Sequence, residues 1–345
     1  MKVGSPITLK EERFKMGKMK IGVCLRIFIL ISLSLILSHF FSEISFGASE
    51  DFPKKEVTII VNFGPGGGRD TIARGVGNTM SKYLGVPIVV MNTPGAGGAL
   101  GLTKLYNSAP DGYTLGIGVA ADIILQITEK QDYDSKRFTY IGNAQHSSDF
   151  LLVKSDSPFR SLKDFKTSGK PIKYSTFSFT AHDTVVSMVI ADREGFPLVF
   201  VGGYQGAAAA LLGLIRGEVE LSGAALSAAR PFVRSGQIRP ILTIDQKRSP
   251  DFPDTPTVGE AGYPELAIFA LDFWFMAPPG VSKARVQVLE DALMKTLKDP
   301  EFLKWAKGAG VDPGPLGAQE TTKLALSLVE FLEKYKTYIE KYMKK

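Results

Sequence analysis

A cluster of glycines directly after a β-branched segment is the first chemical signal in this sequence. Val57–Val61 is rich in strand-forming residues, Gly64–Gly68 follows it, and apolar residues at helical spacing begin at Ile72. This order predicts a strand, a tight turn and a helix that Asp70 or Thr71 would cap. Glycines leave main-chain N–H groups open to a ligand, and the start of a helix attracts negative charge. The segment therefore predicts non-covalent capture of an anion.

The glycine run taken alone also fits a simple connecting turn. It differs from the dinucleotide-binding fingerprint because Arg69 stands where the last glycine of that motif would be. No lysine follows at the spacing of a phosphate-binding loop. The motif therefore indicates an anion site without identifying the anion.

Two further strand ends carry small or glycine-rich loops. The loop Thr93–Gly98 opens a helix over Ala99–Asn107, and a strand over Tyr113–Val119 ends at Ala120 and Ala121. In an open α/β sheet, ligands bind outside the carboxyl ends of the strands. These loops are therefore expected beside the first glycine loop.

The strand and helix pattern starts again near residue 150. Strands are predicted at Ile172–Thr176, Leu198–Val201, Val219–Ser222 and Ile238–Thr243, and helices at His182–Glu194, Ala207–Arg216 and Ser227–Ser235. Polar loops join them and supply hydroxyl and main-chain donors, namely Ser175, Thr176, Thr180 and His182, then Gly203, Tyr204 and Gln205, then Gly223–Ala225. Such groups hold the second end of an anionic ligand or cap helices. The chain of 345 residues thus predicts an α/β fold with two lobes.

The first 48 residues have the pattern of a secretory signal. Basic residues precede the apolar run Ile27–Leu37, and the small residues Ser45, Gly47 and Ala48 follow it. An uncleaved anchor is the alternative, although the run is short for a bilayer. The segment predicts export to the periplasm.

Cysteine and charge exclude several classes of protein. The only cysteine, Cys24, lies in the signal, so the mature chain would contain neither disulfides nor thiolate sites. The signal holds seven of the 41 basic and three of the 35 acidic residues, which leaves a net charge of +2. This near balance removes the main support for nucleic-acid binding.

An exported hydrolase is a second function class to consider. It would need an activated nucleophile, but only His146 and His182 follow the signal and no G-x-S-x-G motif is present. Neither histidine has a second His or Cys at metal-ligand spacing. The sequence therefore predicts no catalytic residue, no metal site and no cofactor.

Four motifs resemble those of the substrate-binding receptors of tripartite tricarboxylate transporters, the Bug family. They are Phe63–Asp70, Asn92–Gly98, Ala109–Leu115 and Lys247–Val258, in register over some two hundred residues. The resemblance implies a periplasmic binding protein of the Venus flytrap, type II-like architecture, in which each lobe is a mixed sheet flanked by helices. On this basis lobe 1 would comprise 49–150 and 272–345, and lobe 2 would comprise 151–271.

The resemblance also implies the activity. A monomeric receptor of this kind captures a small carboxylate, which could be a di- or tricarboxylate, an acidic amino acid or an aromatic acid. It delivers the ligand to membrane transporter subunits, without catalysis and without nucleic acid. A sensor that docks on a signalling partner is the alternative.

The ligand-binding positions carried over from the family lie in both lobes. They are Phe63, Gly66, Gly67, Gly68 and Asp70 in the first lobe, and Ser175, Thr176, Thr180, His182, Gly203, Tyr204 and Gln205 in the second, beside Ala120 and Ala121 from the strand pattern. The chain departs from the family pattern at Arg69, where Thr or Ser is usual. Arg69 is expected to pair with a second carboxylate, which predicts a dicarboxylate ligand.

Overall fold

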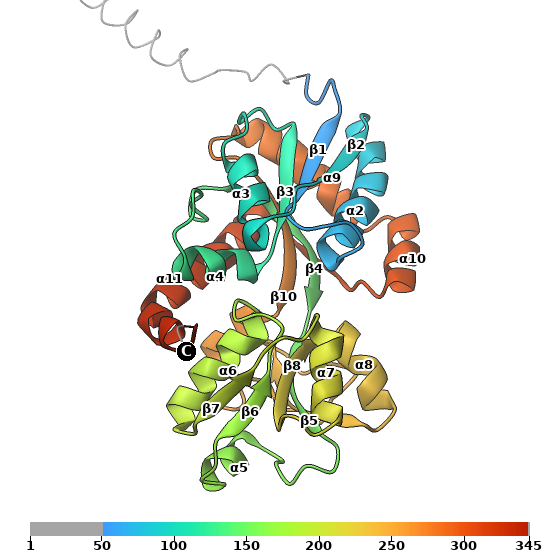
Figure 1. Ribbon diagram of the computed structural model, residues 1–345. Coiled ribbons are helices and arrows are strands. Elements are labelled where there is room, and N and C mark those ends of the chain that lie inside the picture. The colour runs from blue at the N-terminus through green and yellow to red at the C-terminus, as the bar shows by residue number, and fades with distance from the viewer. Residues whose placement is uncertain (1–50, 344–345) are drawn as a thin grey trace, which may run out of the picture. The chain divides into compact units, whose positions relative to one another are not determined.

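A computed structural model describes residues 51–343, which carry two mixed β-sheets flanked by helices (Figure 1). The first sheet has the strand order β11-β4-β10-β3-β1-β2, and the second has the order β7-β6-β8-β5-β9. This arrangement confirms the predicted α/β fold class. The predicted signal, residues 1–48, lies outside the described residues.

The first sheet is built from both ends of the described chain. Its strands are β1 (Val57–Val61), β2 (Ile88–Asn92), β3 (Thr114–Gly118), β4 (Thr139–Ser147), β10 (Leu271–Ala277) and β11 (Pro313–Leu316). Helices α2 (Gly68–Leu84), α9 (Lys283–Thr296) and α10 (Pro300–Ala309) share one hydrophobic core. Helices α3 (Ala99–Tyr106), α4 (Ala120–Thr128) and α11 (Ala318–Met343) belong to another. The strand β1 is apolar except for Thr58, because helices cover both of its faces.

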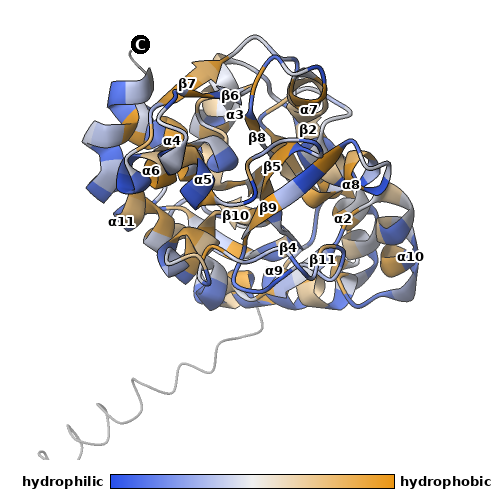
Figure 2. Ribbon diagram, turned by 90° about the horizontal axis from the view of Figure 1, so that it is seen from below, coloured by the Kyte–Doolittle hydropathy of each residue, from blue (hydrophilic) through white to orange (hydrophobic). Residues whose placement is uncertain are grey.

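The second sheet comes from the middle of the chain. Its strands are β5 (Asp149–Lys154), β6 (Ile172–Ser175), β7 (Leu198–Val201), β8 (Leu221–Ala225) and β9 (Ile238–Ile244). Its helices are α5 (Leu162–Thr167), α6 (His182–Glu194), α7 (Ala207–Ile215) and α8 (Leu226–Arg234). Figure 2 shows α7 as hydrophobic, and this helix buries Ala210, Leu211 and Leu214. Two 3₁₀ helices, Ala96–Gly98 (η1) and Pro264–Phe269 (η2), complete the fold.

Strand directions determine which edges of the two sheets face each other. Strand β10 is antiparallel to both β3 and β4, and β1 is parallel to β2 and β3, so β1, β2, β3 and β4 all run the same way. Only Ser148 separates β4 from β5 of the second sheet. The carboxyl ends of β1 and β3 therefore point toward the second sheet.

The second sheet presents its own carboxyl ends in return. Asp149, the first residue of β5, pairs with Ala225 at the end of the antiparallel strand β8. Strand β6 is parallel to β8 and to β7, so these three strands share one direction. Their carboxyl ends, and the amino ends of the helices that follow, thus lie on the side of the first sheet.

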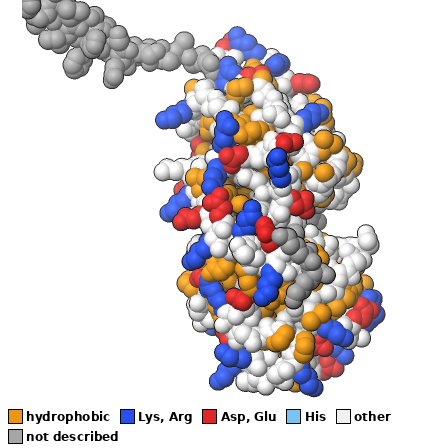
Figure 3. All heavy atoms as spheres, turned by 60° about the vertical axis from the view of Figure 1, so that its left-hand side comes forward, with side chains coloured by type: hydrophobic (Ala, Val, Ile, Leu, Met, Phe, Trp, Pro, Cys, Tyr) orange, Lys and Arg blue, Asp and Glu red, His pale blue; other side chains and the backbone are white. Residues whose placement is uncertain are grey.

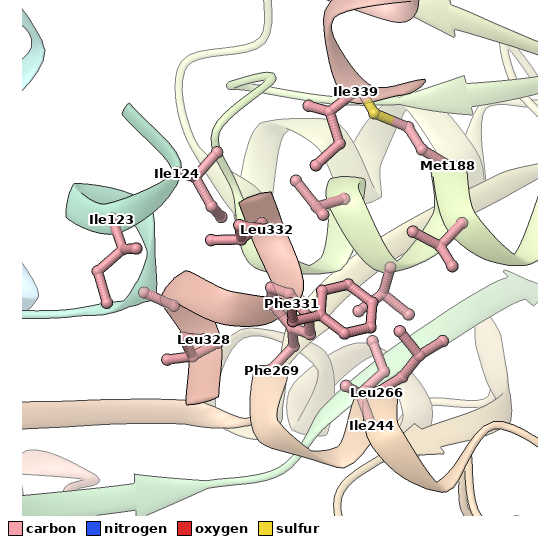
Figure 4. Close-up of a cluster of buried hydrophobic side chains, with 14 of the residues drawn as sticks. Ile123, Ile124, Met188, Ile244, Leu266, Phe269, Leu328, Phe331, Leu332 and Ile339 are labelled. Carbon is pink, nitrogen blue, oxygen red and sulfur yellow. The ribbon is translucent and has the colours of Figure 1, made fainter. Parts of the chain in front are cut away.

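Helix α11 packs against elements of both sheets. It contacts α4 and β4 on one side, and α6 and η2 on the other. Figure 4 shows Leu328, Phe331 and Leu332 of this helix among buried side chains that include Ile124 of α4 and Phe269 of η2. The Tyr338 hydroxyl donates a hydrogen bond of 2.6 Å to the main-chain oxygen of Met188 in α6. One hydrophobic core therefore extends across both sheets.

Several predicted elements end at different residues in the structure. Gly223–Ala225, predicted as a loop, belongs to β8. The apolar segment Ile268–Ala277 predicts a strand, but β10 begins only at Leu271 because the 3₁₀ helix η2 extends to Phe269. The predicted capping of the first helix by Asp70 or Thr71 is wrong, because α2 already begins at Gly68.

The lobe boundaries near residues 150 and 271 stay a prediction, since residues from Asp51 onward form one compact unit.

A membrane-crossing helix would need a longer apolar stretch than any helix in the described residues offers. Figure 3 shows basic and acidic side chains interspersed over one face, in line with the near-neutral charge expected for the mature chain.

Candidate functional site

The carboxylate of Asp70 holds the first glycine loop in place. Its Oδ2 accepts hydrogen bonds from the Gly66 N–H (2.9 Å) and from Arg74 Nε (3.0 Å), and its Oδ1 accepts one from Asn92 Nδ2 (2.9 Å). The Arg74 bond, with those from Gly66 and Asn92, lowers the pKa of Asp70 to about 2 despite its burial. Asp70 is therefore ionised, and it already uses the Gly66 N–H.

The start of α2 supplies main-chain N–H groups that, unlike the Gly66 N–H, are not bonded to Asp70. Gly67 is the N-cap residue, and no side chain caps the helix. The Thr71 N–H makes the first helical bond, to the Gly67 oxygen (2.9 Å). The N–H groups of Gly68, Arg69 and Asp70 thus have no acceptor within the helix. Gly66, Gly67 and Gly68 are exposed, which leaves this end of α2 open to a ligand.

Arg69, expected to pair with a ligand carboxylate, is paired with the carboxylate of Asp122. Its Nη1 lies 2.8 and 2.6 Å from the two carboxylate oxygens of Asp122 and 2.8 Å from Asn62 Oδ1. Both side chains of the pair are buried, with 10% and 6% of their surface exposed. The guanidinium also lies 4.7 Å from the ring centroid of Phe63, which is exposed. The positive charge of Arg69 is therefore already balanced.

Asp122 also organises the start of α4. Its Oδ2 accepts a bond from the Val119 N–H (3.0 Å), which fastens the end of β3 to the helix. Ala120 is buried and Ala121 is half-buried at this helix start. These small residues lie at the carboxyl end of β3, as predicted.

Hydroxyl groups after β6 are bonded to each other. The Ser175 hydroxyl donates to Ser222 Oγ (2.8 Å), and the Thr176 hydroxyl donates to the Ser178 main-chain oxygen (2.8 Å). Thr180 Oγ1 lies 2.9 Å from Ser178 Oγ. These side chains stabilise the loop between β6 and α6, so the main chain of the loop is its freer source of donors.

The loop after β7 has an open main chain. Gly203 and Gly206 adopt positive φ angles of 92° and 94°, a conformation that L residues rarely adopt. The Tyr204 hydroxyl donates to Glu218 Oε2 (2.8 Å), and its ring covers Gly213 of α7. Gln205 is exposed. The Tyr204 side chain thus lies along α7, whereas the glycine backbone stays available.

His182 lies at the start of α6 against the buried carboxylate of Asp149. Its Nε2 forms an ion pair with Asp149 Oδ2, and Asp183 completes a group whose ligand atoms lie within 4.8 Å of one another. Burial opposes protonation of His182, but the negative charge of Asp149 outweighs it and raises the pKa to about 9. Burial also raises the pKa of Asp183. Sequence spacing gave no sign of this group, because Asp149 lies in strand β5 whereas His182 and Asp183 begin helix α6.

His146 joins the two segments that cross between the sheets. Its Nδ1 lies 3.0 Å from Asp272 Oδ1, and its Nε2 lies 3.0 Å from Asp245 Oδ2. Donation of these hydrogen bonds to Asp245, and then to Asp272, raises the pKa of His146 to about 10. Burial raises the pKa of Asp272, whereas the bonds from His146 and Ser148 outweigh burial at Asp245 and lower its pKa. His146 therefore stabilises the crossover and stands apart from the glycine loops.

A cavity of about 890 Å³ lies beside β11 and the loop after β9, at the edge strands of the two sheets that are farthest from the glycine loops. It is lined by β11, the start of α11 and the loop after β9, including Lys247, Arg248 and Lys323. The glycine loops lie toward β1, β2, β6 and β7, at the opposite ends of both strand orders. Arg248 is bonded to Glu260, and acidic residues line the same cavity. Its size alone does not make it the anion site.

The fold thus brings most predicted site residues to the carboxyl ends of strands in the two sheets, which face each other. The loops with Gly66, Gly67, Gly68, Ala120 and Ala121 follow strands of the first sheet, and the loops with Thr180, His182, Gly203 and Gln205 follow strands of the second. Sequence reasoning missed Asn62, Asn92, Asp122, Asp149 and Asp183. These polar side chains, all buried except the half-buried Asn92, hold the loops. Only their positions next to predicted strand ends could have indicated them.

Comparisons with known proteins agree with this architecture. The family model described as "Tripartite tricarboxylate transporter family receptor" matches residues 72–342. A UPF0065 protein of Cupriavidus necator is 29% identical over 85% of this chain and 89% of its own length. Protein BugT of Bordetella pertussis is 27% identical over 77% of this chain and 83% of its own length.

Solved structures are similar over most of the chain. MatC from Rhodopseudomonas palustris with bound malate has a TM-score of 0.67 and 25% identity, covering 83% of this chain and all of its own. Another R. palustris protein, solved with adipate, has a TM-score of 0.67 and 25% identity, covering 84% of this chain and 98% of its own.

Proposed function

The chain belongs to the tripartite tricarboxylate transporter receptor family, and from this premise we propose that it captures a small dicarboxylate between its two sheets. It would bind the ligand in the periplasm, without catalysis, and deliver it to membrane transporter subunits. Malate and adipate, bound by two R. palustris relatives, are both dicarboxylates. Each has two negative ends that need separate sets of donors.

The observation that carries the proposal is the opposition of helix starts. α2 and α4 begin at the carboxyl edge of the first sheet, and α6, α7 and α8 begin at the facing edge of the second. Each start has N–H groups without helical acceptors and the positive end of a helix dipole. Two such groups on facing edges suit a ligand with a carboxylate at each end.

Main-chain groups are the proposed ligand contacts. In the first lobe, the N–H groups of Gly68, Arg69 and Asp70 would hold one carboxylate beside the Phe63 ring, with Gly66, Gly67, Ala120 and Ala121 leaving room for it. In the second, the loops with Ser175, Thr176, Thr180 and His182, and with Gly203, Tyr204 and Gln205, would hold the other. Ordered waters could bridge ligands of different lengths. The Asp70 and Tyr204 side chains act as supports.

The proposed site is tested by Gly67→Val. Gly67 has an extended backbone with φ of −77°, and a Cβ there would meet only the Gly64 oxygen, at 3.9 Å. The variant should fold normally, while its bulk at the start of α2 lowers affinity at least about tenfold, equal to about 1.4 kcal/mol. Lys323→Gln, an exposed change in the cavity at the other edge, is the matched control.

Calorimetry with C4 to C6 dicarboxylates measures affinity, and circular dichroism checks folding. A thermal-shift screen identifies the ligand first, because binding raises stability by mass action. Normal affinity in Gly67→Val with loss in Lys323→Gln would move the site to the cavity. Stabilisation by neutral sugars or amines, with none by carboxylates, would refute the proposed ligand class.

A further inference from the structure

Three buried or half-buried ligand groups converge where β5, β8 and α6 meet. Asp149 is the first residue of β5, and His182 and Asp183 are the first two residues of α6. A nitrogen of His182 and one carboxylate oxygen from each aspartate lie within 4.8 Å of one another. The side chains of Asp149 and His182 are 1% and 14% exposed. Bulk water is therefore a poor partner for these groups.

The Asp149 carboxylate has a partner at only one of its two oxygens. Its Oδ1 has no hydrogen-bond partner among the described residues, and its Oδ2 meets only His182. Within residues 51–343, no lysine or arginine forms an ion pair with Asp149 or Asp183. Burying a carboxylate is costly unless a positive charge or hydrogen bonds compensate it. A protonated His182 balances only one of the two carboxylates. A divalent cation would displace the His182 proton and balance both carboxylates, which together carry a charge of −2.

Supporting contacts hold Asp183 in the group. The Tyr174 hydroxyl donates a bond of 2.6 Å to Asp183 Oδ2, as outer partners commonly orient metal ligands. Gly223 of β8 leaves the room for this arrangement, because a Cβ there would overlap both Asp183 Oδ2 and the Tyr174 hydroxyl. The group and its supporting residues thus come from strands β5, β6 and β8 and from helix α6.

We propose that Asp149, His182 and Asp183 bind a divalent transition-metal ion such as Zn²⁺. One imidazole nitrogen and two carboxylate oxygens are ligands that Zn²⁺ accepts, and three protein ligands leave a fourth position open. The imidazole favours such ions over Mg²⁺ and Ca²⁺, which prefer oxygen alone. Ligands of a tetrahedral Zn²⁺ ion lie about 3.4 Å apart, so side-chain shifts on the order of 1 Å would close the site. The inference does not rest on the proposed carboxylate receptor.

The test measures Zn²⁺ binding to the purified, untagged protein after treatment with a chelator. Calorimetry with ZnCl₂ alone should give one site per chain, with at least about tenfold weaker binding in His182→Gln. His146→Gln is the matched control, because it removes the other histidine of the described region and a pair of similar aspartate contacts. It should bind Zn²⁺ like the wild type.

A second variant and a Co²⁺ spectrum keep the proposal testable if the first variant does not fold. If His182→Gln fails to fold, Asp149→Asn replaces it, and Co²⁺ added to the wild type should give the visible bands of a site with nitrogen and oxygen ligands. Absence of stoichiometric Zn²⁺ binding by the folded wild type would overturn the proposal. Unchanged binding in a folded His182→Gln variant would also overturn it. Both results concern the metal alone, so neither bears on dicarboxylate capture.

Discussion

Removing the Asp122 carboxylate should leave a buried charge on Arg69 without its partner. Loss of one member of a buried ion pair costs about 3–5 kcal/mol of unfolding free energy. Asp122 also accepts bonds from Asn62 Nδ2 (3.1 Å) and the Val119 N–H (3.0 Å), which would lose their acceptor. Arg69 would keep its Asn62 contact and its position over Phe63, each worth on the order of 1 kcal/mol. We therefore expect Asp122→Ala to cost about 3–4 kcal/mol.

The double variant Arg69→Met with Asp122→Leu provides the control. It removes both charges and keeps apolar volume in the pair's place, so its stability should stay within about 1–2 kcal/mol of the wild type. Urea unfolding followed by circular dichroism measures all three proteins. The single variants Arg69→Met and Asp122→Leu complete a double-mutant cycle for the pair.

A cost below about 1 kcal/mol for Asp122→Ala would refute this reasoning, because Arg69 would then behave as a solvated cation. Such an Arg69 could turn to a bound dicarboxylate, as the sequence suggested. The ligand-binding assay separates the two cases. If Arg69 serves Asp122, Arg69→Met should keep dicarboxylate affinity within about threefold of the wild type, once its folding is confirmed.

Three further outcomes follow from other residues. The pKa of Asp70 is about 2 against an ordinary value of 3.8, so its contribution to stability is present above pH 4 and lost as the pH falls toward 2. Asp70→Asn should therefore make the midpoint of urea unfolding less dependent on pH between 4 and 2, and a dependence equal to that of the wild type would contradict this. The pKa of His146 is about 10 against 6.5, so its contribution to stability is full below pH 6.5 and lost as the pH rises through 10, an effect that its partial exposure reduces. His146→Gln should therefore lose less unfolding free energy than the wild type between pH 6.5 and 10, and an equal loss would contradict this. Gly223→Ala should lower the unfolding free energy by about 1–3 kcal/mol because its Cβ would overlap Asp183 and Tyr174, and thermal unfolding that matches the wild type would show that the site relaxes freely.

Local sequence patterns predicted the strands and helices that follow simple rules. The β-branched segment Val57–Val61 and the glycine after α6 mark elements whose local preferences agree with the fold. Strand β4 was missed because its sequence, TYIGNAQHS, contains Gly, Asn, Gln and His, which are weak strand formers. Pairing with β10 and β11 makes this segment a strand.

The candidate site was predictable in its backbone but not in its side chains. Glycine runs at strand ends indicate open N–H groups from sequence alone. Whether Arg69 meets a ligand or Asp122 depends on residues far apart in the chain, and the same holds for His182 and Asp149. Pairing between distant charges needs the folded chain, so the expected role of Arg69 differed from its position in the structure.

The core that α11 shares with both sheets has a consequence for folding. Phe331 of the helix stacks on Tyr335 and packs against Phe269 of η2, while Leu328 lies near α4. A fragment that ends before residue 318 would expose apolar surface on both sides at once. We therefore expect neither half of the molecule to fold when expressed alone, and we expect denaturant to melt both sheets in a single transition.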